Sequence, residues 1–80
     1  MTHAYILVET LPGKSIDLLN AISGKDYIKQ CHLVTGPYDI VAFIEAKDLK
    51  TLGDILVKEI QATGFVGRTL TCVVVESEET

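Results

Sequence analysis

The residues best suited to binding a ligand lie in one short segment, Thr35-Gly36-Pro37-Tyr38-Asp39, between two apolar runs. Gly36 can adopt a positive φ and lets a ligand approach the backbone, and turn amides outside strand pairing can donate to a carboxylate. Pro37 has no N–H, Asp39 can pair with an ammonium group, and Tyr38 can close the site with its ring. Together these groups suit a zwitterion such as a free amino acid. They are also ordinary hairpin-turn residues, and their chemistry alone favours this turn-forming role.

A second candidate segment is Arg68-Thr69-Leu70-Thr71, in which polar and apolar residues alternate. In a strand, Thr69 and Thr71 point to the same side, so their two hydroxyls can hydrogen-bond one polar ligand. Both are equally good β-branched strand formers, and this simpler interpretation is favoured in isolation. Arg68 can hold a carboxylate through two parallel hydrogen bonds, whereas a surface ion pair with a neighbour is its commoner role.

The other polar residues give no sign of catalysis or metal binding. His3 and His32 have no partner at metal-ligand spacing, and the serines lack a G-x-S-x-G setting. There is no glycine-rich phosphate loop. Cys31 and Cys72 lie in separate apolar runs, which favours buried thiols over a disulfide. We therefore expect no enzymatic activity, no cofactor and no metal ion.

Length and composition limit the class of protein. The 80 residues allow one domain with a small core, yet 48% of them are hydrophobic, which predicts a subunit interface. The formal net charge is −4 and the seven basic residues are scattered, so direct binding to nucleic acid is disfavoured. No apolar run approaches the ~18 residues of a membrane span, and no secretion signal is present. A cytoplasmic location without a membrane partner is expected.

The apolar pattern predicts the order strand, helix, strand, strand, helix, strand. The strands are expected at 3–9, 27–34, 38–46 and 66–75, and the first helix at 14–23. Asp48 is the predicted N-cap of the second helix and Gly64 its end. This βαββαβ order is the ferredoxin-like α+β arrangement, a four-stranded antiparallel sheet with two helices on one face. Residues 1–75 are the predicted domain, and residues 76–80 a solvated, frayed acidic tail.

Several of the predicted strands are apolar on both faces. In the first strand, Ala4, Ile6 and Val8 oppose Tyr5 and Leu7, and the third and fourth strands repeat this pattern. A sheet with one solvated face normally carries polar residues on that face. We therefore expect the second face to be buried against another copy of the chain, which makes the protein a homodimer at least.

The segment from Thr35 to Asp39 resembles the Thr-Gly-x-Tyr-Asp hairpin of the Lrp/AsnC ligand-binding domain, also called the RAM domain. The similarity continues through residues 46–49 and through residues 64–71. The latter run resembles the family's Gly-Val-x-Arg-Thr-x-Thr segment, here with Phe65 added. The resemblance covers nearly the whole chain.

This resemblance implies dimers of βαββαβ subunits that assemble into rings, commonly octamers, with amino-acid effectors bound between neighbouring dimers. It makes the ligand-binding role of the turn the favoured one, with Asp39 as the ammonium partner. The effector-binding residues it indicates are Thr35, Gly36, Pro37, Tyr38, Asp39, Thr69 and Thr71.

Full-length members of this family carry a helix-turn-helix domain before the ligand-binding domain, whereas the first predicted strand here begins near Met1. The resemblance therefore indicates a stand-alone effector-binding domain that regulates indirectly, for example by co-assembling with full-length relatives. Two alternatives remain open. One is an ACT-like amino-acid-binding regulatory domain, which would use the turn at residues 10–13. The other is a dimeric α+β barrel enzyme with a pocket between sheet and helices.

Overall fold

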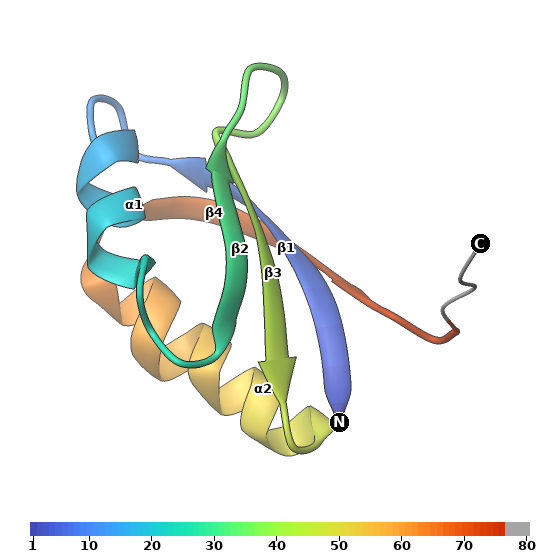
Figure 1. Cartoon of the computed structure of the whole chain (residues 1–80). Coiled ribbons are helices and arrows are strands. Elements are labelled where there is room, and N and C mark those ends of the chain that lie inside the picture. Colours follow the sequence, from blue (N-terminus) through green and yellow to red (C-terminus); the bar gives the residue numbers. More distant parts are fainter. Residues whose placement is uncertain (77–80) are drawn as a thin grey trace.

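The computed structural model describes residues 1–76, which form one sheet and two helical segments (Figure 1). The strands are β1 (Thr2–Thr10), β2 (Ile28–Leu33), β3 (Ile40–Ala46) and β4 (Val66–Val73). The helical elements are α1 (Ser15–Ile22), α2 (Leu49–Ile55), the π-helical turn η1 (Leu56–Ile60) and the 3₁₀ turn η2 (Gln61–Thr63). This confirms the predicted βαββαβ order. Residues 77–80 of the predicted tail lie outside the described part of the chain.

The sheet has the strand order β2-β3-β1-β4, and all neighbouring strands are antiparallel. Strands β1 and β3 pair in the centre, from Thr2 opposite Ala46 to Val8 opposite Ile40. Both helical segments pack on the same face of this sheet (Figure 1). The ferredoxin-like fold expected from the sequence is therefore confirmed.

The core lies between the sheet and the helices. It contains alternate residues of the two central strands, which confirms the predicted face of β1, together with residues of both helical segments. Its members, none more than 4% exposed, are Ala4, Ile6, Val8, Leu18, Ile22, Ile40, Ala42, Ile44, Ala46, Leu52 and Ile60. Burying one Val, Leu or Ile side chain contributes about 1.5–3 kcal/mol, so this layer fixes the helices on the sheet.

The second helical segment begins and ends at the predicted residues. The amide of Thr51 donates to Oδ1 of Asp48 at 2.8 Å, which satisfies one of the unpaired amides of the first turn. Hydrogen bonds from Thr51 hold the pKa of the Asp48 carboxyl below its usual value. Gly64 follows η2 with φ +82°, a left-handed conformation that glycine adopts without steric cost.

Between these ends, the segment is not the single α-helix that the sequence predicts. Residues Leu56–Ile60 form a π-helical turn, in which each hydrogen bond spans one more residue than in an α-helix. Leu52 and Ile60 nevertheless both face the core, with exposed fractions of 2% and 0%. Leu49, the first residue of α2, is apolar but 61% exposed. The apolar pattern therefore predicts the helical segment and its core contacts but not its hydrogen-bonding type.

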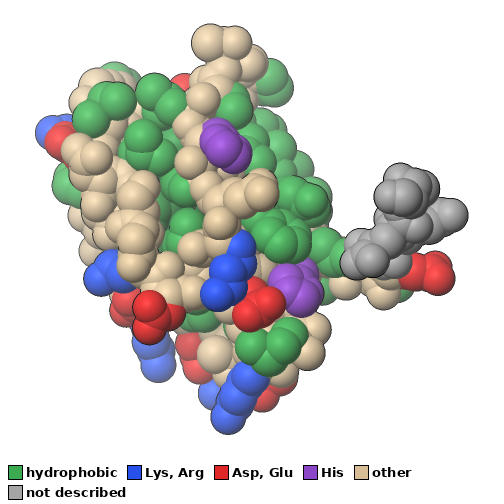
Figure 2. Space-filling view, viewed as in Figure 1, with side chains coloured by type: hydrophobic (Ala, Val, Ile, Leu, Met, Phe, Trp, Pro, Cys, Tyr) green, Lys and Arg blue, Asp and Glu red, His purple; other side chains and the backbone are tan. Residues whose placement is uncertain are grey.

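Within residues 1–76, no helix covers the opposite face of the sheet, which we call the outer face. Residues directly opposite one another in antiparallel strands lie on the same face, and the pairing places six apolar side chains together there. They are Tyr5, Leu7, Val41, Phe43, Leu70 and Cys72. Tyr5 and Leu70 are 46% and 47% exposed, and Figure 2 shows hydrophobic side chains gathered over the sheet. The predicted second apolar face is therefore present.

The two cysteines differ in their surroundings, and both are free thiols. Cys31 lies opposite Ala42 on the helix side and is partly buried, and this burial raises the pKa of its thiol. Cys72 lies on the outer face of the edge strand β4 and is exposed. The expectation of a buried thiol is wrong for Cys72 in the single chain, because no helix among residues 1–76 covers this face.

Candidate effector site

The candidate site is the loop between β2 and β3, which projects from one end of the sheet (Figure 1). The amide of Val34 donates to the carbonyl of Asp39, and the amide of Asp39 donates to the carbonyl of Val8, both at 2.8 Å. Gly36 has φ +147°, as its role in the sequence predicts, and a Cβ placed there would meet nothing within 4 Å. Residues 35–37 are all exposed. The ends of the loop are therefore fixed, while its tip presents open backbone.

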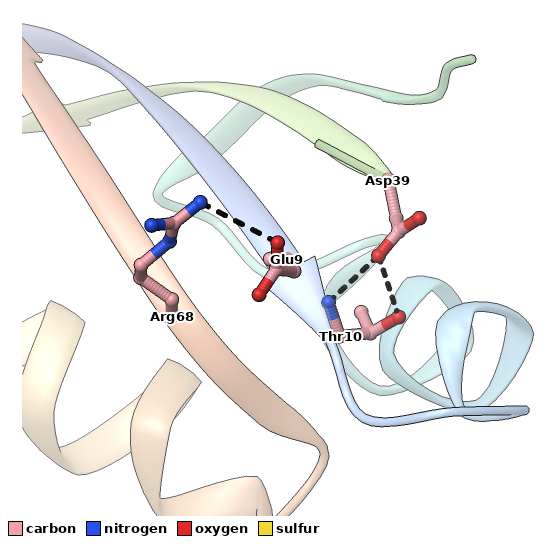
Figure 3. A network of polar contacts seen from close by, with 4 residues as sticks. All are labelled: Glu9, Thr10, Asp39 and Arg68. Carbon is pink, nitrogen blue, oxygen red and sulfur yellow. Dashed lines mark hydrogen bonds and ion pairs between the residues drawn. The ribbon is translucent and has the colours of Figure 1, made fainter. Parts of the chain in front are cut away.

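Asp39 is held through one of its two carboxylate oxygens (Figure 3). Its Oδ2 accepts from the amide of Thr10 at 2.8 Å and from the hydroxyl of Thr10 at 3.0 Å. That hydroxyl lies 2.8 Å from Oγ of Ser15, which therefore acts as the donor to Thr10. No hydrogen bond among residues 1–76 uses Oδ1 of Asp39. One oxygen thus fixes the side chain and the other can accept from a cationic group.

Arg68 reaches the same end of the sheet from β4. Its Nη2 lies 3.4 Å from Oε2 of Glu9, and its Cζ lies 5.6 Å from the centre of the Tyr38 ring. The Arg68 and Glu9 side chains are 62% and 46% exposed, so their ion pair contributes less than about 1 kcal/mol. Arg68 therefore forms the surface ion pair expected of it, and it also contacts the candidate loop.

Thr69 and Thr71 point to the helix side of the sheet. They lie opposite Val8 and Ile6, and both are partly buried. Nε2 of the Gln61 side chain donates to Oγ1 of Thr69 at 3.4 Å. Because Arg68 points to the outer face, one chain does not bring the two threonines to the side of the sheet where Arg68 meets the loop.

Sequence reasoning missed the end of β1 as part of this site. The pairing of β1 with β4 shifts register between Glu9 and Thr10, and these consecutive residues hold Arg68 and Asp39 (Figure 3). A Cβ at Gly67 would stand 3.2 Å from the carbonyl oxygen of Glu9, so a glycine allows the two strands to approach here. A glycine inside a strand pattern often marks such an irregularity, and Gly67 is the signal that indicates it.

A second polar cluster lies at the other end of β1. Nε2 of His3 is 2.7 Å from Oε2 of Glu45, and Nζ of Lys29 is 3.8 Å from Oε1 of the same carboxylate. The hydrogen bond with His3 is the main reason why the pKa of Glu45 is lowered. The His3 ring stacks on Phe43 with centroids 5.4 Å apart. Residues 1–76 contain no group of three or more His, Cys, Asp or Glu side chains that could hold a metal ion.

None of the helices in the described part of the chain is long and apolar enough to cross a membrane.

The strand order, the helices on one face and the exposed apolar outer face define an α+β domain of the ferredoxin-like class. Residues 3–79 match the Lrp/AsnC ligand binding domain, and the chain belongs to this family. The family indicated by the Thr35–Asp39 and 64–71 segments is thereby confirmed.

Solved structures agree with this assignment. TTHA0845 from Thermus thermophilus is 29% identical, with a TM-score of 0.93 over 100% of both chains. PHS023 from Pyrococcus horikoshii is 25% identical, with a TM-score of 0.87 over 96% of this chain and 93% of that one. The transcriptional regulator NMB0573 from Neisseria meningitidis, in complex with L-Met, is 15% identical. It shares the fold, with a TM-score of 0.88 over 99% of this chain and 53% of its own. No curated protein matched the chain.

Proposed function

We propose that this protein is an amino-acid-binding, oligomer-forming regulatory domain that acts without contacting DNA directly. The observation that carries the proposal is the state of Asp39, whose carboxylate is fixed by Thr10 through Oδ2 while Oδ1 accepts nothing from residues 1–76. Membership of the Lrp/AsnC ligand binding domain family supports a regulatory role. The L-Met complex of the Neisseria relative supports an amino acid as the ligand class.

In this proposal the loop recognises both charged groups of an amino acid. The α-ammonium donates to Oδ1 of Asp39, which forms a charge-assisted hydrogen bond. The α-carboxylate accepts from loop amides, because no backbone hydrogen bond within residues 1–76 uses the N–H of Thr35, Gly36 or Tyr38. Successive amides near a glycine form a concave site for anions. Pro37 has no N–H and shapes the loop.

The outer face supports assembly into a homodimer, with two sheets packed face to face. Its apolar side chains occupy the centre of the sheet, while the Glu9–Arg68 and His3–Glu45 pairs lie toward its two ends. A core of apolar residues with a polar rim is the usual anatomy of a subunit interface. In an octameric ring of such dimers, the loop would lie between dimers, where Thr69 and Thr71 of other subunits complete the effector site.

The charge of the chain supports indirect regulation. With a formal net charge of −4, the sequence does not concentrate its basic residues in one segment that could neutralise phosphates. Co-assembly with full-length Lrp/AsnC relatives would connect amino-acid binding to DNA. We expect native mass spectrometry of subunits refolded together with such a relative to show mixed oligomers. Complete separation into pure oligomers would remove this part of the proposal.

Calorimetric titration with the twenty standard L-amino acids tests the ligand-binding part. We expect at least one of them to bind the wild type and to bind Asp39→Asn about ten-fold or more weakly. The asparagine keeps a carbonyl acceptor for Thr10 but removes the negative charge. Asp26→Asn is the matched control, because Asp26 is exposed and lies outside the loop. No binding of any amino acid by the wild type would overturn the proposal.

A further inference from the structure

We infer that Arg68 joins the loop amides in binding the α-carboxylate of the effector and that Glu9 competes with the effector for the same guanidinium group. This inference rests on the proposed amino-acid-binding function and deepens it. It assigns a second charged residue to the site, from a different strand, and makes Glu9 a residue that limits affinity. The ligand class it requires has a free carboxylate beside its ammonium group.

The first argument is the contact between Arg68 and the loop. The guanidinium carbon lies 5.6 Å from the centre of the Tyr38 ring, within the range of a cation–π interaction. Tyr38 immediately precedes Asp39, so the guanidinium group of Arg68 lies against the loop residue next to the one that carries the carboxylate. A planar guanidinium group matches the two oxygens of a carboxylate, and it provides a full charge that loop amides lack.

The second argument is the arrangement of charges around the end of β1. Glu9 holds Arg68 from β4, and the next residue, Thr10, holds Asp39 in the loop before β3 (Figure 3). A cation and an anion are thus each anchored to one of two adjacent residues of β1. Gly67 permits the register shift at which this occurs, because β4 passes close to the carbonyl of Glu9. An α-amino acid carries the complementary pair of charges.

The third argument is that Glu9 holds Arg68 weakly. Their separation of 3.4 Å is longer than the ~2.7–2.9 Å of strong charge-assisted hydrogen bonds. The contact uses a single nitrogen, the Arg68 side chain is exposed and the Glu9 side chain is about half exposed. No other hydrogen bond from the Arg68 side chain occurs among residues 1–76. A ligand carboxylate that accepts from two guanidinium nitrogens would therefore displace Glu9 at little cost.

The test compares an amino acid with its carboxamide, which lacks the carboxylate. L-methionine and L-methioninamide, or the acid and amide of whichever standard amino acid binds tightest, are titrated into the protein at pH 6. At this pH the α-amino group of both ligands is mostly protonated. We expect the wild type to bind the acid at least about ten-fold more tightly than the amide. In Arg68→Gln this ratio falls to about three or less, mainly through weaker binding of the acid.

Three further variants complete the design. Arg68→Lys keeps the charge but lacks the planar fork, and we expect an intermediate ratio. Glu9→Gln removes the competitor, and we expect the acid to bind about three- to ten-fold more tightly while binding of the amide stays unchanged. Lys25→Gln removes an exposed positive charge on the loop after α1 and serves as the control with the wild-type ratio.

The outcomes separate this inference from the function on which it rests. If the wild type binds no amino acid, the proposed function fails and Arg68 has no ligand to recognise. If the wild type binds the acid and Arg68→Gln keeps the acid-to-amide ratio, the inference fails while the function stands. If Arg68→Gln dissociates the oligomer in sedimentation at an unchanged ratio, Arg68 is an assembly residue and the inference is overturned. If Arg68→Gln does not fold, the opposite expectations for Arg68→Lys and Glu9→Gln decide the question.

Discussion

Oδ2 of Asp39 lies 2.8 Å from the backbone nitrogen of Thr10, and this bond joins the loop before β3 to the end of β1, 29 positions earlier in the chain. The same oxygen accepts from the Thr10 hydroxyl at 3.0 Å. One side chain thus closes a long-range contact and carries the proposed ammonium site. We therefore expect substitutions of Asp39 to change fold stability and ligand affinity through different oxygens, and the two effects can be measured separately.

Asp39→Ala should lower the free energy of unfolding by about 1–3 kcal/mol, because it leaves the partly buried amide and hydroxyl of Thr10 without their acceptor. Asp39→Asn should stay within about 1 kcal/mol of the wild type, since its carbonyl oxygen can accept the same bonds. Urea denaturation of both variants measures this difference. Equal stabilities would show that the bonds to Thr10 do not support the fold.

Replacing two of the glycines with alanine should change the stability of the fold in opposite directions. Gly67→Ala places a Cβ 3.2 Å from the carbonyl oxygen of Glu9, and we expect a loss of about 1–3 kcal/mol from the resulting strain. Gly53 lies within α2 with nothing within 4 Å of its Cβ position, so Gly53→Ala should stabilise the protein by up to about 1 kcal/mol. Thermal unfolding of both variants provides the comparison. A neutral Gly67→Ala would show that β4 shifts away from β1 without cost.

The fold was predictable because apolar residues repeat at a different spacing in strands and in helices. In addition, the capping residue Asp48 and the glycine Gly64 mark the ends of the second helical segment. The π-helical turn at Leu56–Ile60 was not predictable, because the same apolar residues suit an α-helix. The exposure of Cys72 depends on its position on the uncovered outer face of an edge strand. Strand order is a property of the whole chain, and a local pattern does not contain it.

The residues of the candidate loop were predictable from the sequence, whereas their contacts with other strands were not. The loop residues are adjacent in sequence, so glycine, tyrosine and aspartate could be recognised together. The contacts of Asp39 with Thr10 and of Tyr38 with Arg68 join distant segments, and they depend on the register of β1 with its neighbours. The side to which Thr69 points relative to the loop follows from the same register. The roles of all these residues in effector binding stay predictions.

The N-cap of α2 should make stability depend on pH in the acidic range. The pKa of Asp48 is lowered in the folded protein by hydrogen bonds from Thr51, so the unfolded chain takes up the proton first as the pH falls. The stabilisation is therefore complete above the unfolded-state pKa of about 3.9 and is lost as the pH falls through the lower folded-state pKa. Melting temperatures measured from pH 7 to pH 2 should show wild type above Asp48→Ala at neutral pH. The melting temperatures of the two proteins should converge near pH 2. A difference that stays constant with pH would show that the Asp48 carboxylate is not the cause.

A charge on the outer face should block assembly without unfolding the subunit. Leu70 lies opposite Leu7 on this face and is 47% exposed in the single chain. In a face-to-face dimer Leu70→Glu would bury an unpaired carboxylate, which costs about 3 kcal/mol or more and raises the dimer dissociation constant at least about 100-fold. Val57→Glu is the control, because Val57 lies on η1 and is 57% exposed.

Sedimentation velocity at micromolar concentration should give monomers for Leu70→Glu and wild-type oligomers for Val57→Glu. Circular dichroism should show the same fold in both, and Leu70→Glu oligomers of wild-type size would place the dimer interface elsewhere.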